Sequence, residues 1–151
     1  MSNSKNFLSF IQRKFLAKIR LGCLEIRIEM GSYAWPRLSE EARTCLVCSN
    51  QNQEVENEVH FLFNCKTYQA ERLAWTQKLT VPDNFLTLPE AEKLDFVLNA
   101  HSNVKPTAQY IINIFDKRSK IVNNLPSAMN DNTVLYHLEP HDQCPACTLP
   151  V

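Results

Sequence analysis

Four side chains of metal-binding types lie close together in this sequence. Cys45, Cys48, His60 and Cys65 follow the spacing C-x2-C-x11-H-x4-C. A C-x2-C pair presents two thiolates from one tight turn, and a later histidine and cysteine complete the tetrahedron of a structural zinc site. Three sulfurs and one imidazole favour Zn²⁺ over Mg²⁺ or Ca²⁺. The pattern predicts zinc that holds the fold without binding substrate; the alternative is ordinary buried thiols and a core histidine.

The spacing also predicts the local shape of the chain around His60. Apolar residues recur at helical spacing from Val55 to Phe63, and Asn57 is a suitable N-cap. In an unbroken α-helix, Cys65 would lie roughly 140° around and about 7.5 Å along from His60. One ion cannot bind both from those positions, so we expect the helix to end near Asn64, which tolerates a left-handed conformation.

Charged neighbours are expected around such a site. Three thiolates and Zn²⁺ carry a net charge of about −1, which favours nearby cations and hydrogen-bond donors. Arg43 and Lys66 are the candidates beside the ligands in the sequence. Glu56 or Glu58 is expected to orient His60 through its second ring nitrogen.

The charges of the chain are balanced overall but unevenly distributed. The sequence has 16 basic and 16 acidic residues, and residues 1–44 hold eight basic and four acidic ones. Residues 45–100 reverse this ratio, with four basic and eight acidic residues. No apolar run reaches the length of a membrane span, and charges interrupt the apolar positions of the first residues, unlike a signal peptide. We therefore expect an intracellular protein, nuclear or cytoplasmic, whose clustered cysteines bind metal.

The first predicted helix, residues 6–21, is amphipathic and basic. Its expected buried stripe is Phe7, Ile11, Phe15 and Ile19, with Leu8 and Leu16 beside it, and Gly22 is the expected stop. The basic residues are Arg13, Lys14, Lys18 and Arg20. They form either the solvated face of a core helix or a contact surface for nucleic acid.

Further elements follow from periodicity and capping signals. Residues 24–28 alternate like a short strand, Thr67 is expected to cap the next helix, and Thr87 and Glu90 to form a capping box around Pro89. We expect a loop over residues 99–105 and a helix that starts at Pro106. Periodicity is lost after Val122, which predicts a helical domain over residues 1–122 and a flexible tail over 123–151.

Several separated pieces of the chain resemble the zinc-binding C-terminal tail of reverse transcriptases from non-LTR retrotransposons. The matching pieces are Leu16-x-x-Ile19-Arg20-x-Gly22, Ile28-Glu29-x-Gly31-x-Tyr33, Arg43-x-Cys45-x-x-Cys48, Val55-Glu56-Asn57-Glu58-x-His60-Phe61-Leu62, Cys65, Tyr68 and Arg72. Ser32 stands where the family usually has arginine, and Asn57 where it usually has aspartate. The resemblance implies Cys45, Cys48, His60 and Cys65 as zinc ligands and a nucleic-acid role in target-primed reverse transcription.

Polymerase chemistry is not expected, because paired aspartates for two metal ions are missing from the sequence. No phosphate-binding glycine-rich loop or catalytic triad is recognisable either, so we expect no enzyme. The C-terminal residues His137, His141, Cys144 and Cys147 are candidates for a second metal site, with an unstructured tail as the alternative.

These observations predict a mainly α fold, a small helical domain organised around a CCHC zinc knuckle, with a short β ribbon as an option beside it. The leading function is a non-catalytic zinc-binding module that binds RNA or DNA. The alternatives are a zinc-stabilised protein-interaction module, whose acidic middle faces a partner, and a decayed retroelement fragment without selected function.

Overall fold

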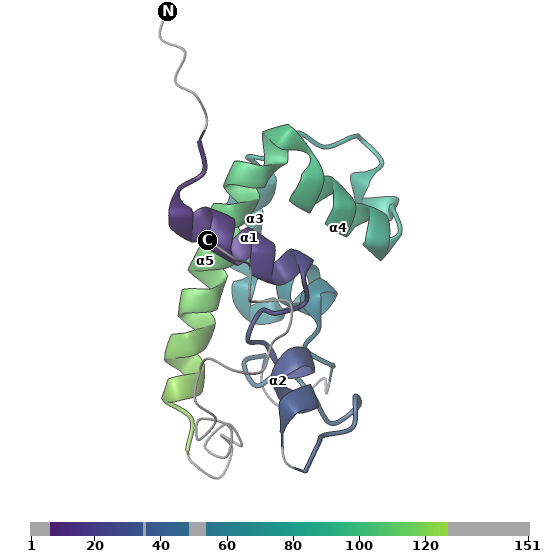
Figure 1. Ribbon diagram of the computed structural model, residues 1–151. Helices are drawn as coiled ribbons and strands as arrows, with labels where there is room; N and C mark the ends of the chain where they lie inside the picture. Colours follow the sequence, from purple (N-terminus) through teal and green to yellow (C-terminus); the bar gives the residue numbers. More distant parts are fainter. Residues whose placement is uncertain (1–6, 35, 49–53, 127–151) are drawn as a thin grey trace, which may run out of the picture.

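The computed structural model describes residues 7–34, 36–48 and 54–126. These residues form a mainly helical fold, as predicted, with no extended strand among them. The longest helix, α5 (His101–Asn123), contacts α1 (Phe10–Arg20), α3 (Gln69–Thr76) and α4 (Glu90–Asn99). In Figure 1, α1 crosses in front of α5, whereas α2 (Arg27–Tyr33) lies near the lower end of the molecule. Helix α5 is thus the support on which α1, α3 and α4 pack.

Both ends of α1 are fixed by local signals. The hydroxyl of Ser9 accepts a hydrogen bond from the Gln12 N–H (3.2 Å), and the Gln12 side chain accepts one from the Ser9 N–H (2.9 Å). At the other end Gly22 has a φ of 63°, and the Cys23 N–H donates to the Lys18 carbonyl (2.8 Å). This left-handed glycine closes the helix in a Schellman arrangement, which confirms the predicted stop.

The predicted buried stripe of α1 is confirmed in part. Leu16 and Ile19 are buried, and Leu8 and Phe15 pack against the core, whereas Phe7 and Ile11 are exposed and Gln12 is buried instead. The amide of Gln12 both completes the capping box and hydrogen-bonds α5, so a polar residue turns inward. Phe10, Ile11 and Leu21 are left exposed, so the outer face of α1 carries apolar side chains.

The predicted strand at residues 24–28 was also wrong. Leu24 and Ile26 are buried, but the chain turns there, and α2 begins at Arg27. The backbone N–H of Arg27 donates to a carboxylate oxygen of Glu56 (2.8 Å). A negative charge at this position stabilises the helix N-terminus. Because Glu56 is distant in the sequence, local alternation could not reveal this start.

Helix α5 starts five residues before the predicted proline. It begins at His101 after the single residue Ala100, and Pro106 lies inside it. The expected loop over residues 99–105 is therefore absent. The buried side chain of Asn103 accepts from the Thr80 N–H (2.8 Å) and donates to the Thr80 carbonyl (3.0 Å). This tertiary clamp holds the first turn in place although Pro106 supplies no backbone donor.

The two predicted threonine caps do not form. Thr67 donates to the carbonyl of Val47 (3.0 Å), and α3 begins after a short 3₁₀ turn, η2 (Lys66–Tyr68). Thr87 donates to the carbonyl of Asn84 (2.8 Å) within the 3₁₀ turn η3 (Phe85–Thr87). Helix α4 nevertheless starts directly after Pro89, close to the predicted position.

The predicted domain boundary at residue 122 lies one residue before the end of α5 at Asn123. The division into a domain over residues 1–122 and a tail over 123–151 stays a prediction. The second candidate cluster, His137, His141, Cys144 and Cys147, lies outside the described residues.

A buried ion pair connects α5 to the middle of the chain. The Glu56 side chain is fully buried and the Arg118 side chain is 6% exposed. The guanidinium donates to both carboxylate oxygens, at 2.8 Å from Nε and 2.7 Å from Nη2. The two parallel hydrogen bonds fix the orientation of the two groups. Because both side chains are buried, water cannot replace either partner.

We predict that Arg118→Met destabilises the fold by about 3–5 kcal/mol, because it leaves the Glu56 carboxylate buried without its partner. The matched control is Lys120→Met, which removes an exposed ion pair with Asp116 on the same helix and should change stability by less than about 1 kcal/mol. Urea unfolding followed by circular dichroism measures both. Equal shifts in the two variants would show that the buried pair has no special role.

Candidate metal centre

The structure brings the four predicted ligands together. The ligand atoms of Cys45, Cys48, His60 and Cys65 all lie within 4.8 Å of one another. The Cys45 and Cys65 sulfurs are 4.0 Å apart, and the Cys48 sulfur lies 3.5 Å from Nε2 of His60. This Cys₃His cluster can hold a metal ion, and its four protein ligands would complete a tetrahedral coordination shell.

The cysteine turn is positioned by a minimal ribbon. The Cys45 N–H donates to the carbonyl of Glu54 (2.9 Å), beside an isolated antiparallel bridge between Thr44 and Val55. Within the described residues, the ribbon considered from sequence is reduced to this bridge. It is nevertheless sufficient to bring the chain before the cysteine turn alongside the chain that leads to His60.

A capped π turn positions the other two ligands. The side chain of Asn57 accepts from the His60 N–H (2.8 Å), which confirms the predicted cap. The π turn η1 (His60–Asn64) then ends with the Cys65 N–H donating to the His60 carbonyl (2.7 Å). Because an i→i+5 hydrogen bond closes the turn, Cys65 comes back beside His60. The helix ends at Asn64 as predicted, and its last turn is a π turn.

A carboxylate orients the histidine ligand. Nδ1 of His60 lies 2.8 Å from Oε2 of Glu54, which leaves Nε2 directed at the cysteines. Such a partner fixes the ring tautomer of a metal-binding histidine and raises its basicity. The prediction that Glu56 or Glu58 has this role was wrong. Glu56 instead pairs with Arg118.

Within the described part of the chain, the two cations expected beside the cluster, Arg43 and Lys66, form no hydrogen bond or ion pair with its side chains. Arg43 is buried and donates to the carbonyls of Leu38 (2.9 Å) and Ile28 (3.0 Å), so it organises the turn around α2. A Cβ atom on Gly31 would lie 2.6 Å from Cγ of Arg43, so this crossing requires glycine. Lys66, the other candidate, is exposed.

Positive charge reaches the cluster from later helices. The guanidinium of Arg72 on α3 donates to the backbone carbonyls of Cys65 and Leu62. Lys117 on α5 donates to the Thr67 carbonyl (2.9 Å), in the turn that follows Cys65. With Arg118, these side chains set cationic groups around an anionic cluster.

The protonation states of the ligands are linked. The hydrogen bond from Cys45 lowers the pKa of Cys65 to about 4, and His60 contributes in the same direction. That hydrogen bond and burial raise the pKa of Cys45, and burial raises the pKa of Cys48. Burial lowers the pKa of His60, but hydrogen bonds to Cys65 and Glu54 outweigh it and raise the value. Metal must therefore displace protons, so affinity falls as pH falls.

The predicted nucleic-acid residues all lie on α1 but differ in their contacts. Arg13 and Lys14 are exposed, and Arg13 also donates to the Leu8 carbonyl (2.7 Å). Lys18 is paired with Glu25. Arg20 donates to the Leu98 carbonyl at the end of α4.

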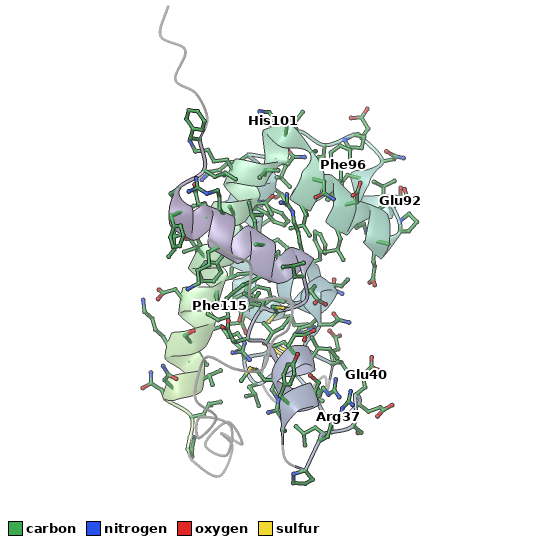
Figure 2. The ribbon with its side chains drawn as sticks, in the orientation of Figure 1. Arg37, Glu40, Glu92, Phe96, His101 and Phe115 are labelled. Atoms are coloured by element: carbon green, nitrogen blue, oxygen red, sulfur yellow. The ribbon has the colours of Figure 1, made fainter. Side chains whose placement is uncertain are left out.

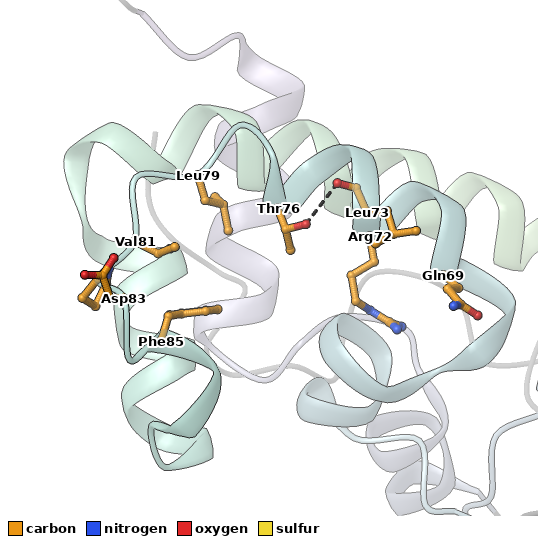
Figure 3. A pocket seen from close by; sticks show the side chains of 9 residues that line it. Gln69, Arg72, Leu73, Thr76, Leu79, Val81, Asp83 and Phe85 are labelled. Carbon is orange, nitrogen blue, oxygen red and sulfur yellow. Dashed lines mark hydrogen bonds between the residues drawn. The ribbon is translucent and has the colours of Figure 1, made fainter.

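A separate apolar groove borders α3 (Figure 3). It has a volume of about 600 Å³ and is lined by residues of α3 and of the segment 79–85. Leu73 on its wall is 60% exposed. Figure 3 shows the groove extending from Asp83 at one end to Gln69 at the other. Its composition suits an apolar side chain of a partner more than a polar substrate.

No family model, curated protein or solved structure matches this chain. In the part of the chain that the structure describes, none of the helices combines the length and apolar character needed to cross a membrane.

We predict that Cys48→Ser loses most of the bound metal and the cooperative thermal transition, because serine replaces a thiolate ligand. Cys23→Ser is the matched control, since Cys23 lies outside the cluster. Metal analysis by plasma mass spectrometry and thermal melts measure the two effects. Retention of metal and cooperativity in Cys48→Ser would show that the cluster is not a metal centre.

We predict that Glu54→Ala weakens metal affinity by about 10- to 100-fold, because His60 loses the partner that orients its ring. Competition with a chromogenic chelator measures the affinity. Glu58→Ala is the control and should retain the affinity of the wild type. A loss of the same size in both variants would indicate a general effect of charge instead of a contact with His60.

Proposed function

We propose that the Cys₃His cluster is a structural zinc site. A tetrahedral zinc ion with Zn–S of about 2.3 Å and Zn–N of about 2.0–2.1 Å requires S···S and S···N separations of about 3.8 and 3.5 Å. The separations of 4.0 Å between Cys45 and Cys65 and 3.5 Å between Cys48 and His60 agree with this geometry. The soft ligand set favours zinc over hard cations.

In this proposal the zinc ion stabilises a small module that binds nucleic acid and has no catalytic activity. The observation that carries it is the charge of α1, whose residues include four cations and no acidic side chain. The charged groups of these four side chains can contact phosphates of RNA or DNA, and such contacts carry little sequence information. The origin that best accounts for a cysteine–histidine cluster preceded by a basic helix is the C-terminal tail of a retrotransposon reverse transcriptase.

The four cations contribute unequally in this proposal. Lys18 is neutralised by Glu25, and Arg20 is held against the end of α4. Arg13 and Lys14 are exposed on α1 and can meet a phosphate without breaking an ion pair. We therefore assign the main phosphate contacts to Arg13 and Lys14.

The groove beside α3 favours a second candidate function, a protein-interaction module. Its apolar walls and the exposed Leu73 suit a partner's apolar side chain. The acidic residues between positions 45 and 100 offer a partner less negative charge than their number indicates. Glu54, Glu56 and Glu71 pair with His60, Arg118 and Lys117 inside the domain.

We predict that Arg13→Ala/Lys14→Ala lowers the slope of log affinity against log salt by about 1.4–1.8, because two phosphate contacts are lost. Lys18→Ala/Arg20→Ala removes the same charge and should lower the slope less. Fluorescence anisotropy with single-stranded RNA and duplex DNA over a salt series measures the slopes.

Zinc content should be equal in all three proteins. Absence of binding by the wild type at low salt would contradict the nucleic-acid function and favour the protein-interaction module. Equal slope changes in both double variants would contradict the assignment to Arg13 and Lys14.

A further inference from the structure

The outer face of α1 combines apolar and basic side chains. Phe10, Lys14, Ala17 and Leu21 recur at helical spacing and form one stripe opposite the buried Leu16. Phe10 is 73% exposed and Leu21 is 52% exposed. A phenylalanine exposed to this degree at the start of a well-packed helix contributes little to the core.

The aromatic ring of Phe10 is presented from a rigid support. It follows the N-cap Ser9, so the capping box with Gln12 fixes its backbone. Gln12 also reaches Gln109 on α5 (3.4 Å). One turn later Phe15 packs edge-on against Phe115 of α5, with ring centroids 5.3 Å apart, and Figure 2 shows Phe115 just below α1. Such preorganisation reduces the entropy lost when a ligand binds.

Two basic residues follow Phe10 at helical spacing. Arg13 and Lys14 are three and four residues after Phe10, so both side chains neighbour it on the helix surface. An aromatic ring beside two cations fits a ligand that has a flat apolar group next to a negative charge. A nucleotide has this chemistry, because its base stacks on an aromatic ring while its phosphate meets a cation.

We propose that Phe10 is a stacking platform for an unpaired base, which makes single-stranded nucleic acid the preferred ligand of this face. The inference rests on the proposed nucleic-acid function and specifies its substrate class. In a duplex the base faces are stacked on one another and do not reach an exposed ring.

The test compares wild type, Phe10→Ala, Phe10→Tyr and Leu73→Ala, with single-stranded RNA and duplex DNA of mixed sequence as probes. Loss of one stacking contact should weaken single-strand binding by about 5- to 150-fold in Phe10→Ala. Phe10→Tyr should bind within about threefold of wild type, because tyrosine retains the aromatic face. Leu73→Ala removes a comparably exposed apolar side chain on α3 and should have no effect.

The salt slope separates this inference from the function on which it rests. Phe10 carries no charge, so its replacement should leave the slope unchanged while affinity for the single strand falls. If the wild type binds single-stranded RNA and Phe10→Ala binds it with the same affinity, the stacking platform is overturned, whereas the proposed phosphate contacts are not. An equal loss for duplex DNA also overturns it, because the ring would then act as a wedge between base pairs. If the wild type binds neither the single-stranded RNA nor the duplex DNA, both the stacking platform and the nucleic-acid function are overturned.

Discussion

The buried carboxylate of Glu56 contacts three separate parts of the chain. It accepts hydrogen bonds from the first N–H of α2 at Arg27 and from the guanidinium of Arg118 on α5, and it lies 3.7 Å from the sulfur of Cys45 in the Cys/His cluster. A carboxylate removed from water costs several kcal/mol unless its partners are present. The start of α2, the cysteine turn and the middle of α5 must therefore assemble together, which couples the metal centre to the fold.

Local features of the sequence were sufficient for the Cys/His cluster and for several helix boundaries. Residue type and spacing, which depend on a short stretch of chain, predicted that the four side chains of the cluster lie together. The Asn57 cap and the Gly22 stop were predicted for the same reason, because each satisfies backbone groups within one turn. The sequence argument also required a departure from α-helical geometry between His60 and Cys65.

The remaining features depend on partners that are distant in the sequence. Glu54 and Glu56 alternate along one stretch, and only the folded chain shows that Glu54 faces His60 while Glu56 faces α5. The early start of α5 depends on Asn103, whose amide meets a segment before α4. At the start of α1, Gln12 is buried in place of Ile11 because its amide is satisfied internally, and apolar periodicity ignores such contacts.

The position of Arg118 has a consequence for the order of events during synthesis. All four residues of the Cys/His cluster precede Arg118, so the ribosome releases the cluster before the charge that neutralises Glu56. Until then the fold lacks the partner that offsets the cost of burying the Glu56 carboxylate. We expect the nascent chain to complete the packing around the Cys/His cluster only once α5 has left the exit tunnel.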